Sequence, residues 1–524
     1  MKTLVGLIQR SFSTTCEIFL ILILIYVVQG SLSTFENEYE EEAKIMYLLF
    51  PSAIVLGTST SSRIEYARKT RENRQGLEYS AVLLPCVMAA RMVYVKSRDR
   101  SDYFERGSFW AAISISTISS LSYAIETRDR PKRFMKQISM SICIAYLCVI
   151  NIMREFLSDY NRRFDPKYVL VTISILFTLL HVQSLRTKLL YKTTTLGETF
   201  ILFQGFSMWI SSYIFGFNSN DPVCCIMRSG TLACFSIVLI ATFVFSSSNN
   251  TRRPTLMYAT VFFTSLALIF AFPLMWFALG QNPVTWLFVS FIMGTPTRVC
   301  IIFSWGLVLL LALPNLQSGS KNIPRIVSRK LFHILAVVMF LPVLYFDLDM
   351  LYVSFGIASS LMILAECSRV LRVSRIYQVL SRYMLSFTDD RDQGTIVMSH
   401  FYLLLGCAIP LWLVPRSAVD NSVTSSILPA SAGILSVGIG DAVAAVIGTF
   451  MGRTKWYGTN KTVEGTLIAS VVTSALAVSL LLVSEDKVTK VLTFVTMTCL
   501  LETFTKQMDN LILPLYLFSL LALI

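Results

Sequence analysis

Residues 331–346 read LFHILAVVMFLPVLYF, an apolar run that contains no Asp, Glu, Lys or Arg. Similar runs follow at 351–366 and 396–414, and others recur along nearly the whole chain. Each approaches the roughly 20 apolar residues that a helix needs to cross a bilayer core of about 30 Å. Because the runs are continuous rather than alternating, they favour helices over strands. The sequence therefore predicts an all-α, polytopic transmembrane protein.

The composition agrees with this fold class. Of 524 residues, 54% are hydrophobic and 15% are charged, which is more apolar surface than a soluble chain of this length could bury. We expect about fifteen spans, with a range of about 13 to 17. The first apolar run, 16–28, follows Lys2 and Arg10 as the core of a signal peptide would. We interpret it as a first span or a signal anchor.

Several classes of site and partner are disfavoured. The chain has 11 cysteines, none in a Cys-x-x-Cys pair, and only 3 histidines, so neither a disulfide framework nor a zinc site is predicted. The net charge of +13 comes from basic loops next to apolar runs, as the positive-inside rule expects. We therefore predict no nucleic acid partner, and the sequence leaves the oligomeric state unknown.

The chain divides by character near residue 280. Residues 1–280 form an N-terminal transmembrane region with short basic loops and no chemical motif, so their role is left unassigned. Residues 281–524 form a C-terminal region whose loops combine carboxylates, glycines and basic residues. We predict that this second region is catalytic.

Charge predicts the orientation of the second region. If spans lie at about 331–346, 351–366, 396–414, 430–450, 465–483 and 488–501, the loops alternate between two sides. Loops 315–330, 367–395, 451–464 and 502–510 carry thirteen Lys and Arg, against two in 347–350, 415–429 and 484–487. The positive-inside rule places the first group in the cytosol. Every polar cluster described below then lies at one membrane face.

A glycine-rich block at 438–466 is the most informative part of the chain. It begins Gly438-Ile439-Gly440-Asp441 and continues as GRTKWYGTNKTVEGT from Gly452. Glycines let backbone N–H groups approach phosphates, and basic side chains supply charge, so the block resembles a nucleotide triphosphate site without Walker A spacing. Its candidate binding residues are Gly438, Gly440, Gly452, Arg453, Lys455, Lys461, Thr462, Glu464 and Gly465. The alternative is a small-residue stripe of Gly440, Ala444, Gly448 and Gly452 for helix packing.

Three acids are candidate metal ligands. Asp441 lies within an apolar segment, where an acid is costly and therefore points to a functional site. Near the C-terminus, Glu502, Lys506 and Asp509 would share one face of a continuous helix. A surface ion pair between Glu502 and Lys506 is the alternative there.

Further candidates lie at other loops of the same predicted face. Arg329 and Lys330 precede His333 at a helix entrance, as phosphate contacts or as membrane anchors. Glu366 could act as a base or pair with Arg369 three residues on. The segment 388–394 contains Asp390 and Asp392, either as functional carboxylates or as a solvated turn.

These clusters, in this order, resemble the dolichol kinase family. The resemblance covers about residues 283–520 and runs through 329–333, 389–394, 399–406, 440–465 and 502–515. It implies a CTP-binding loop at 438–466 and phosphorylation of dolichol for protein glycosylation. It also implies an endoplasmic reticulum membrane location with the nucleotide site facing the cytosol, in agreement with the charge argument.

The resulting hypothesis is a CTP-dependent dolichol kinase that uses Mg²⁺ or another divalent cation. Asp441, Asp509 and Glu502 are expected to hold the metal, and Lys461, Arg453 and Lys455 to neutralise the phosphates. The base is left open among His333, Asp390, Asp392 and Glu366. A kinase of another lipid alcohol or a lipid cytidylyltransferase is the alternative. A transporter also carries intramembrane acids, but it should show an inverted repeat, which the sequence lacks.

Overall fold

The computed structural model describes residues 2–58, 76–98, 105–110, 279–319, 324–370, 396–415, 423–480 and 484–524, with short pieces between 112 and 277 and residues 378 and 381. Every regular element in these ranges is a helix, which confirms the all-α prediction. The elements are α1 (Lys2–Ser33), α2 (Glu36–Met46), α3 (Leu49–Thr58), α4 (Leu77–Lys96), α11 (Pro283–Thr285), the π-helix η2 (Trp286–Met293), α12 (Pro296–Gly319), α13 (Arg325–Phe346), α14 (Leu348–Val370), α16 (Ser399–Leu413), α17 (Val423–Ala430), the π-helix η4 (Ile434–Asp441), α18 (Ala442–Phe450), α19 (Val463–Leu480), α20 (Glu485–Phe504) and α21 (Asp509–Leu521).

Three described helices are long and apolar enough to cross a membrane: Phe12–Ser33, Ile326–Phe346 and Leu348–Glu366. A fourth span results if Pro283–Met293 and Pro296–Ala312, which are bent by 94°, are counted together. Shorter apolar helices occur at Ser399–Leu413, Ile434–Phe450, Val463–Ser479 and Asp509–Leu521. The count of about fifteen stays a prediction, because most of 117–271 lies outside the described residues.

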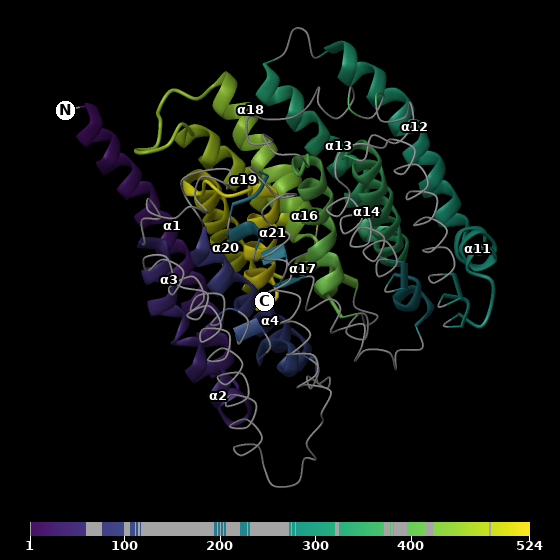
Figure 1. The fold of residues 1–524 in the computed structure, drawn as a ribbon, viewed down its shortest axis with the longest axis horizontal. Coiled ribbons are helices and arrows are strands. Elements are labelled where there is room, and N and C mark those ends of the chain that lie inside the picture. The colour runs from purple at the N-terminus through teal and green to yellow at the C-terminus, as the bar shows by residue number, and fades with distance from the viewer. Residues whose placement is uncertain are drawn as a thin grey trace, which may run out of the picture.

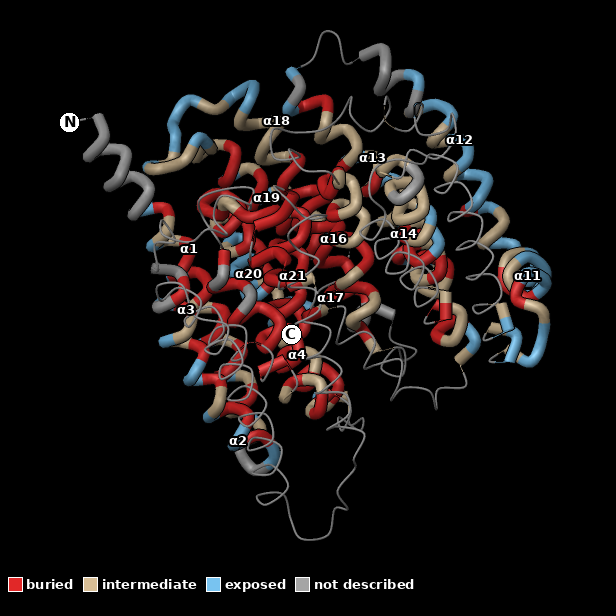
Figure 2. The backbone as a smooth tube through the Cα atoms, viewed as in Figure 1, coloured by how far each residue is buried: buried red, intermediate tan, exposed pale blue. Residues whose placement is uncertain are grey.

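Helix α21 forms the centre of the bundle. Residues Asn510–Leu521 are all buried, as expected for a helix that is apolar on every side. It contacts α16, α4, α20, η4, α1 and α17. Figure 1 shows α21 surrounded by these elements, and Figure 2 shows that buried residues concentrate around it.

The N-terminal helices belong to the same packed core. Helix α1 contacts α20 and α21, and α4 packs along α21. The Tyr516 hydroxyl donates to the Leu20 carbonyl over 3.0 Å. The division at residue 280 stays a prediction, but α1 and α4 share one core with α20 and α21.

Helix α12 lies at the periphery of the bundle (Figure 1). Its side chains Phe303, Leu307 and Leu310 are 75%, 57% and 71% exposed. Large exposed apolar side chains along a whole helix are expected where lipid, and not water, is the solvent.

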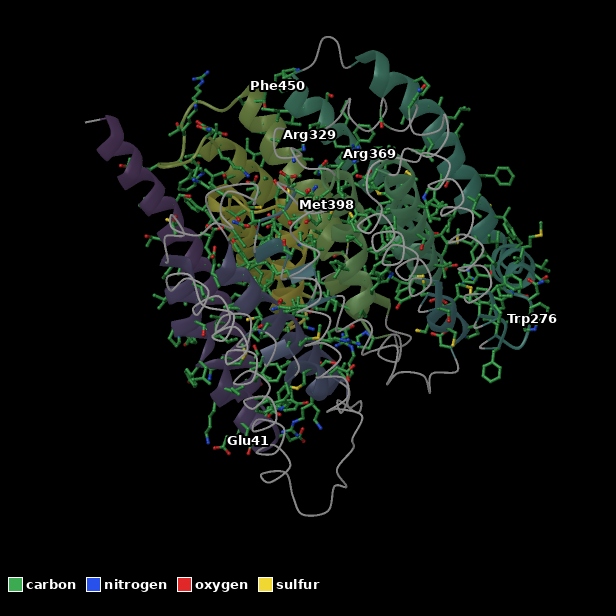
Figure 3. All side chains as sticks on the ribbon, in the orientation of Figure 1. Glu41, Trp276, Arg329, Arg369, Met398 and Phe450 are labelled. Carbon is green, nitrogen blue, oxygen red and sulfur yellow. The ribbon has the colours of Figure 1, made fainter. Side chains whose placement is uncertain are left out.

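Some helix ends for which the sequence predicts a common side lie at the same end of the described structure. Figure 3 places Arg329, Arg369 and Phe450 towards one end of the molecule, with Glu41 at the other end. The span predicted at 430–450 is a broken helix, because η4 joins α18 at Asp441. The spans predicted at 465–483 and 488–501 correspond to α19 and α20. The start of α13 and the end of α18 therefore lie towards the same end.

Candidate active site

Asp441 sits where η4 changes to α18, inside the bundle. Its side chain is 3% exposed. The nine residues of α18 beyond it rise about 1.5 Å each, so Asp441 is recessed by roughly 14 Å from the outer end of that helix. A π-helical turn is a frequent feature of functional sites, since its carbonyls leave the regular i to i−4 pattern.

Helix α13 brings a lysine and a histidine against η4. The ammonium of Lys330 forms an ion pair with Asp441 Oδ2. His333 Nδ1 lies 2.9 Å from the Val437 carbonyl oxygen and 3.4 Å from Asp441 Oδ2. A carbonyl can only accept, so Nδ1 carries a proton in the neutral ring and the lone pair is on Nε2. Gly438 permits this approach, because a Cβ there would lie 2.6 Å from Val337 Cγ2.

Two further acids join Asp441. Carboxylate oxygens of Asp441, Glu502 and Asp509 all lie within 4.8 Å of one another. Glu502 is near the end of α20, which stops at Phe504, and Asp509 opens α21. The expectation that Glu502, Lys506 and Asp509 share one helical face was wrong, because the helix breaks between them. The turn brings the two acids together instead.

Lys461 reaches this cluster from the segment between α18 and α19. Its Nζ pairs with Glu502 Oε1 and lies 2.8 Å from the Glu502 carbonyl oxygen. Burial by itself would lower the pKa of Lys461, but the negative charges of Glu502, Asp509 and Asp441 outweigh it, so the pKa is raised. Lys461 is therefore a fixed positive charge. The partner of Lys461 is Glu502, for which the sequence left a surface ion pair with Lys506 as the alternative.

Residues 451–462 form a hairpin between α18 and α19. Lys455 and Thr462 form an antiparallel bridge, and the Trp456 amide donates to the Lys461 carbonyl over 3.0 Å. Gly458 has φ of +80°, a left-handed conformation that favours glycine. Arg453 and Lys455 are exposed on this hairpin.

Glu464 anchors the base of the hairpin. Its carboxylate accepts the Thr454 amide over 2.9 Å. Hydrogen bonds from the backbone, of Glu464 itself first and then of Thr454, lower the pKa of the Glu464 carboxyl. The Glu464 side chain therefore orders the hairpin.

The glycines of the block mediate close helix packing. A Cβ at Gly448 would lie 2.9 Å from Thr462 Oγ1, and one at Gly452 would lie 2.5 Å from Thr462 Cγ2. A Cβ at Gly465 would lie 2.7 Å from the Ala444 carbonyl oxygen. These distances support the small-residue interpretation of α18 against α19. Phosphate contact by the same glycines stays a prediction.

A small recess, with room for about one water molecule, lies beside Asp441 and Glu502. Gly440 also lines it, and Val495, Leu513 and Leu517 contribute apolar side chains. Thr473 also lines it, is 1% exposed, and has no hydrogen-bond partner for Oγ1 within the described structure. The site thus combines carboxylates, two ammonium groups and an apolar recess.

Comparison with known proteins gives the family. The family model for dolichol kinase matches residues 138–484. A mouse dolichol kinase is 28% identical over 84% of this chain and 85% of its own length. The Arabidopsis thaliana dolichol kinase EVAN is 35% identical over 47% of this chain and 44% of its own. The chain belongs to the dolichol kinase family. No solved structure matches it.

The match to the dolichol kinase family model ends before Glu502 and Asp509. The structure brings these two acids to the site, where they lie beside Asp441. Sequence reasoning selected both as metal candidates, but it missed Thr473, which is an unremarkable polar residue in an apolar helix.

Other predicted site residues of this dolichol kinase family member lie apart from the cluster or outside the description. Glu366 accepts two bonds from Arg369, at 2.8 and 2.6 Å, and one from the Val397 amide at 2.7 Å. The pairing alternative for Glu366 is therefore confirmed, and it ties α14 to the start of α16. Arg329 is half-buried at the start of α13, next to Lys330. Asp390 and Asp392 lie outside the described residues.

Proposed function

We propose that this chain transfers the γ-phosphoryl group of CTP to the terminal hydroxyl of dolichol at the site around Asp441. Membership in the dolichol kinase family gives the reaction class. The observation that supports the location is the convergence of three carboxylates within 4.8 Å, with Lys330 and Lys461 ion-paired to two of them. Phosphoryl transfer depends mainly on positioning and charge neutralisation, and this set of charges supplies both.

The acid cluster fits a hard divalent cation such as Mg²⁺. Carboxylate oxygens are the ligands that Mg²⁺ prefers, and Asp441, Glu502 and Asp509 each offer one. Three acids so close together are also costly without positive charge. A bound cation would supply charge neutralisation at the phosphate oxygens.

Positive side chains occur at two depths. Arg453 and Lys455 are exposed on the hairpin, whereas Lys461 and Lys330 are 31% and 15% exposed and reach the acids. We assign the inner pair to the γ-phosphoryl group and the outer pair to the rest of CTP. Arg453 can form a bidentate pair with a phosphate, whereas Lys455 acts as a point charge.

We assign the small recess beside Asp441 and Glu502 to the acceptor hydroxyl alone, because it has room for about one water-sized group. Thr473 Oγ1 would bond the alcohol oxygen there. Transfer forms a bond from that oxygen to the γ-phosphorus and breaks the bond to the β-phosphate oxygen, so CDP leaves. His333 is the base we favour for the hydroxyl proton, because its Nε2 carries the lone pair.

We place the enzyme in the endoplasmic reticulum membrane with the hairpin in the cytosol. The orientation is supported by the excess of Lys and Arg in the loops that the sequence predicts on that side, and the choice of membrane by the family resemblance. Figure 3 shows Arg329, Arg369 and Phe450 towards that end. A nucleotide site near it would receive CTP directly.

The test uses membranes carrying the full chain, labelled CTP, ATP or GTP, and dolichol or a short-chain alcohol. We expect dolichyl phosphate and CDP from CTP, and at least about a hundred-fold loss in Asp441→Asn. Asp486→Asn, a change of an exposed acid at the start of α20, is the matched control and should retain activity. Pyrophosphate release with a CDP-lipid product would show a cytidylyltransferase instead. Normal activity in Asp441→Asn would remove this site.

A further inference from the structure

The turn at residues 504–508 decides where two of the three acids lie. It follows Glu502 at the end of α20 and precedes Asp509 at the start of α21. Any displacement of this turn changes the separation of their carboxylates. Within the described structure, several hydrogen bonds to the turn come from residues more than 300 positions away in the chain.

Helices α1 and α4 hold the first part of the turn. Ser13 Oγ donates to the Phe504 carbonyl oxygen over 3.1 Å, which satisfies an acceptor at the helix end. The Tyr79 hydroxyl lies 2.8 Å from Glu17 Oε1 and 3.2 Å from Thr505 Oγ1. A phenol has one proton, so Tyr79 donates to the carboxylate and the Thr505 hydroxyl supplies the other proton.

A capping box near residue 195 holds the second part. The Thr195 amide donates to Glu198 Oε2 over 3.1 Å, and the Glu198 amide donates back to Thr195 Oγ1 over 3.2 Å. The other carboxylate oxygen, Glu198 Oε1, accepts the Met508 amide over 2.8 Å. Thr195 Oγ1 also donates to Gln507 Oε1 over 2.6 Å.

Gly76 shows that the start of α4 packs closely against the 504–508 turn. It opens α4 with φ of +61°, and a Cβ there would lie 2.3 Å from the side-chain oxygen of Gln507. Gln507, Glu17 and Glu198 are 1%, 0% and 0% exposed. A buried carboxylate is costly, so a role in fixing one backbone turn accounts for Glu198 better than a general packing role would.

We propose that Glu198, with Thr195, positions the metal-binding carboxylates of Glu502 and Asp509 by holding the 504–508 turn. The N-terminal half then contributes positioning residues to the site, whereas the three acids themselves lie in the C-terminal half. This inference rests on the proposed function, since it requires a cation at the three acids. Partners behind metal ligands commonly change metal affinity by about 10- to 100-fold when they are removed.

The experiment measures Mn²⁺ binding by electron paramagnetic resonance to the purified full-length chain, without nucleotide or lipid. We expect Glu198→Ala to weaken Mn²⁺ binding by about ten-fold or more. Glu198→Gln keeps one acceptor oxygen, so it should weaken binding less. Thr195→Val is the milder variant that tests the same turn if Glu198→Ala does not fold.

Glu42 provides the matched control. It is a glutamate of the N-terminal half, 1% exposed, and it accepts bonds from Arg106 and Trp110. Figure 3 shows its neighbour Glu41 at the opposite end of the molecule from Phe450. Glu42→Gln should lower thermal stability but leave Mn²⁺ affinity unchanged.

The outcomes separate this inference from the proposed function. Asp441→Asn should lose Mn²⁺ binding; if it does not, the metal site itself is wrong and the inference falls with it. If Asp441→Asn loses binding while Glu198→Ala and Thr195→Val bind as the unmodified chain does, the site stands and the positioning role is overturned. An equal loss in Glu42→Gln would show a general effect of instability and would also overturn it.

Discussion

Lys461 illustrates how neighbouring charges fix the state of one side chain. Its pKa is raised because attraction to Glu502, Asp509 and Asp441 outweighs the cost of burial. The ion pair therefore stabilises the folded state fully below the ordinary lysine pKa of about 10.4 and is lost only as pH rises through the higher folded-state pKa. Between pH 6 and 9 this residue should not titrate.

The first prediction follows from that charge. Lys461→Arg, whose guanidinium stays charged at any accessible pH, should reduce activity but keep the shape of the pH profile between 6 and 9. Initial rates at saturating CTP across that range check this. An alkaline decline that is present in the unmodified chain and absent in Lys461→Arg would contradict the assignment of a raised pKa.

Thr473 gives a second prediction at the residue scale. Valine has nearly the same shape, so Thr473→Val removes a buried hydroxyl without a partner and should leave thermal stability unchanged or higher. If Oγ1 bonds the alcohol, the KM for dolichol should rise roughly five-fold, which corresponds to about 1 kcal/mol.

Thr498 is the control for that change. It lines the same pocket, but its hydroxyl already donates to the Phe494 carbonyl over 2.8 Å. Thr498→Val should therefore leave the KM for dolichol close to that of the unmodified chain. An unchanged KM in Thr473→Val, or an equal rise in both variants, would remove the proposed contact.

At the scale of elements, the hairpin between α18 and α19 separates two roles that the sequence placed in one block. Gly448, Gly452 and Gly465 allow α18 and α19 to pack closely, while Arg453 and Lys455 remain exposed.

We predict that Arg453→Ala with Lys455→Ala raises the KM for CTP by roughly ten-fold, about 1.4 kcal/mol, with little change in kcat. Lys487→Ala with Lys490→Ala, at the start of α20, should change neither constant. A fall in kcat at unchanged KM would place the two hairpin charges at the reacting phosphate instead.

The sequence alone predicted some of the helices and some of the site residues. Continuous apolar runs predicted α13, α14 and α16 close to their observed bounds. An acid in an apolar segment identified Asp441, because burial of charge demands a reason. A loop at 502–510 was predicted and contains the observed break at 505–508. The meeting of Glu502 and Asp509 with Asp441 was not predicted, because it depends on long-range hydrogen bonds to that turn.

At the scale of the whole molecule, the contribution of the first 200 residues could not be predicted. The capping box Thr195-x-x-Glu198 is readable as a helix start, but nothing in its spacing indicates a bond to Met508, more than 300 residues on. Such contacts depend on how α1, α4 and α21 pack around one another, which is a tertiary property. Sequence motifs identify residues that take part directly in the reaction, but they do not identify residues that only position them.

The orientation of the molecule gives the last prediction. Helix α19 has 18 residues and a length of about 27 Å, so if it crosses the bilayer as the sequence predicts, its two ends lie near opposite faces. The hairpin precedes it, and the start of α20 follows it.

In sealed microsomes, Lys455→Cys should react with a membrane-impermeant maleimide, whereas Asp486→Cys should react only after permeabilisation. The unmodified chain sets the background, because Cys300 is exposed. The Asn460-Lys461-Thr462 sequon offers an independent check: if the hairpin faces the cytosol, Asn460→Gln and the unmodified chain show the same mass change on glycosidase treatment. Reversed labelling, or a glycan on Asn460, would place the carboxylate cluster on the lumenal side, away from cytosolic CTP, and would contradict the proposed direction of nucleotide entry.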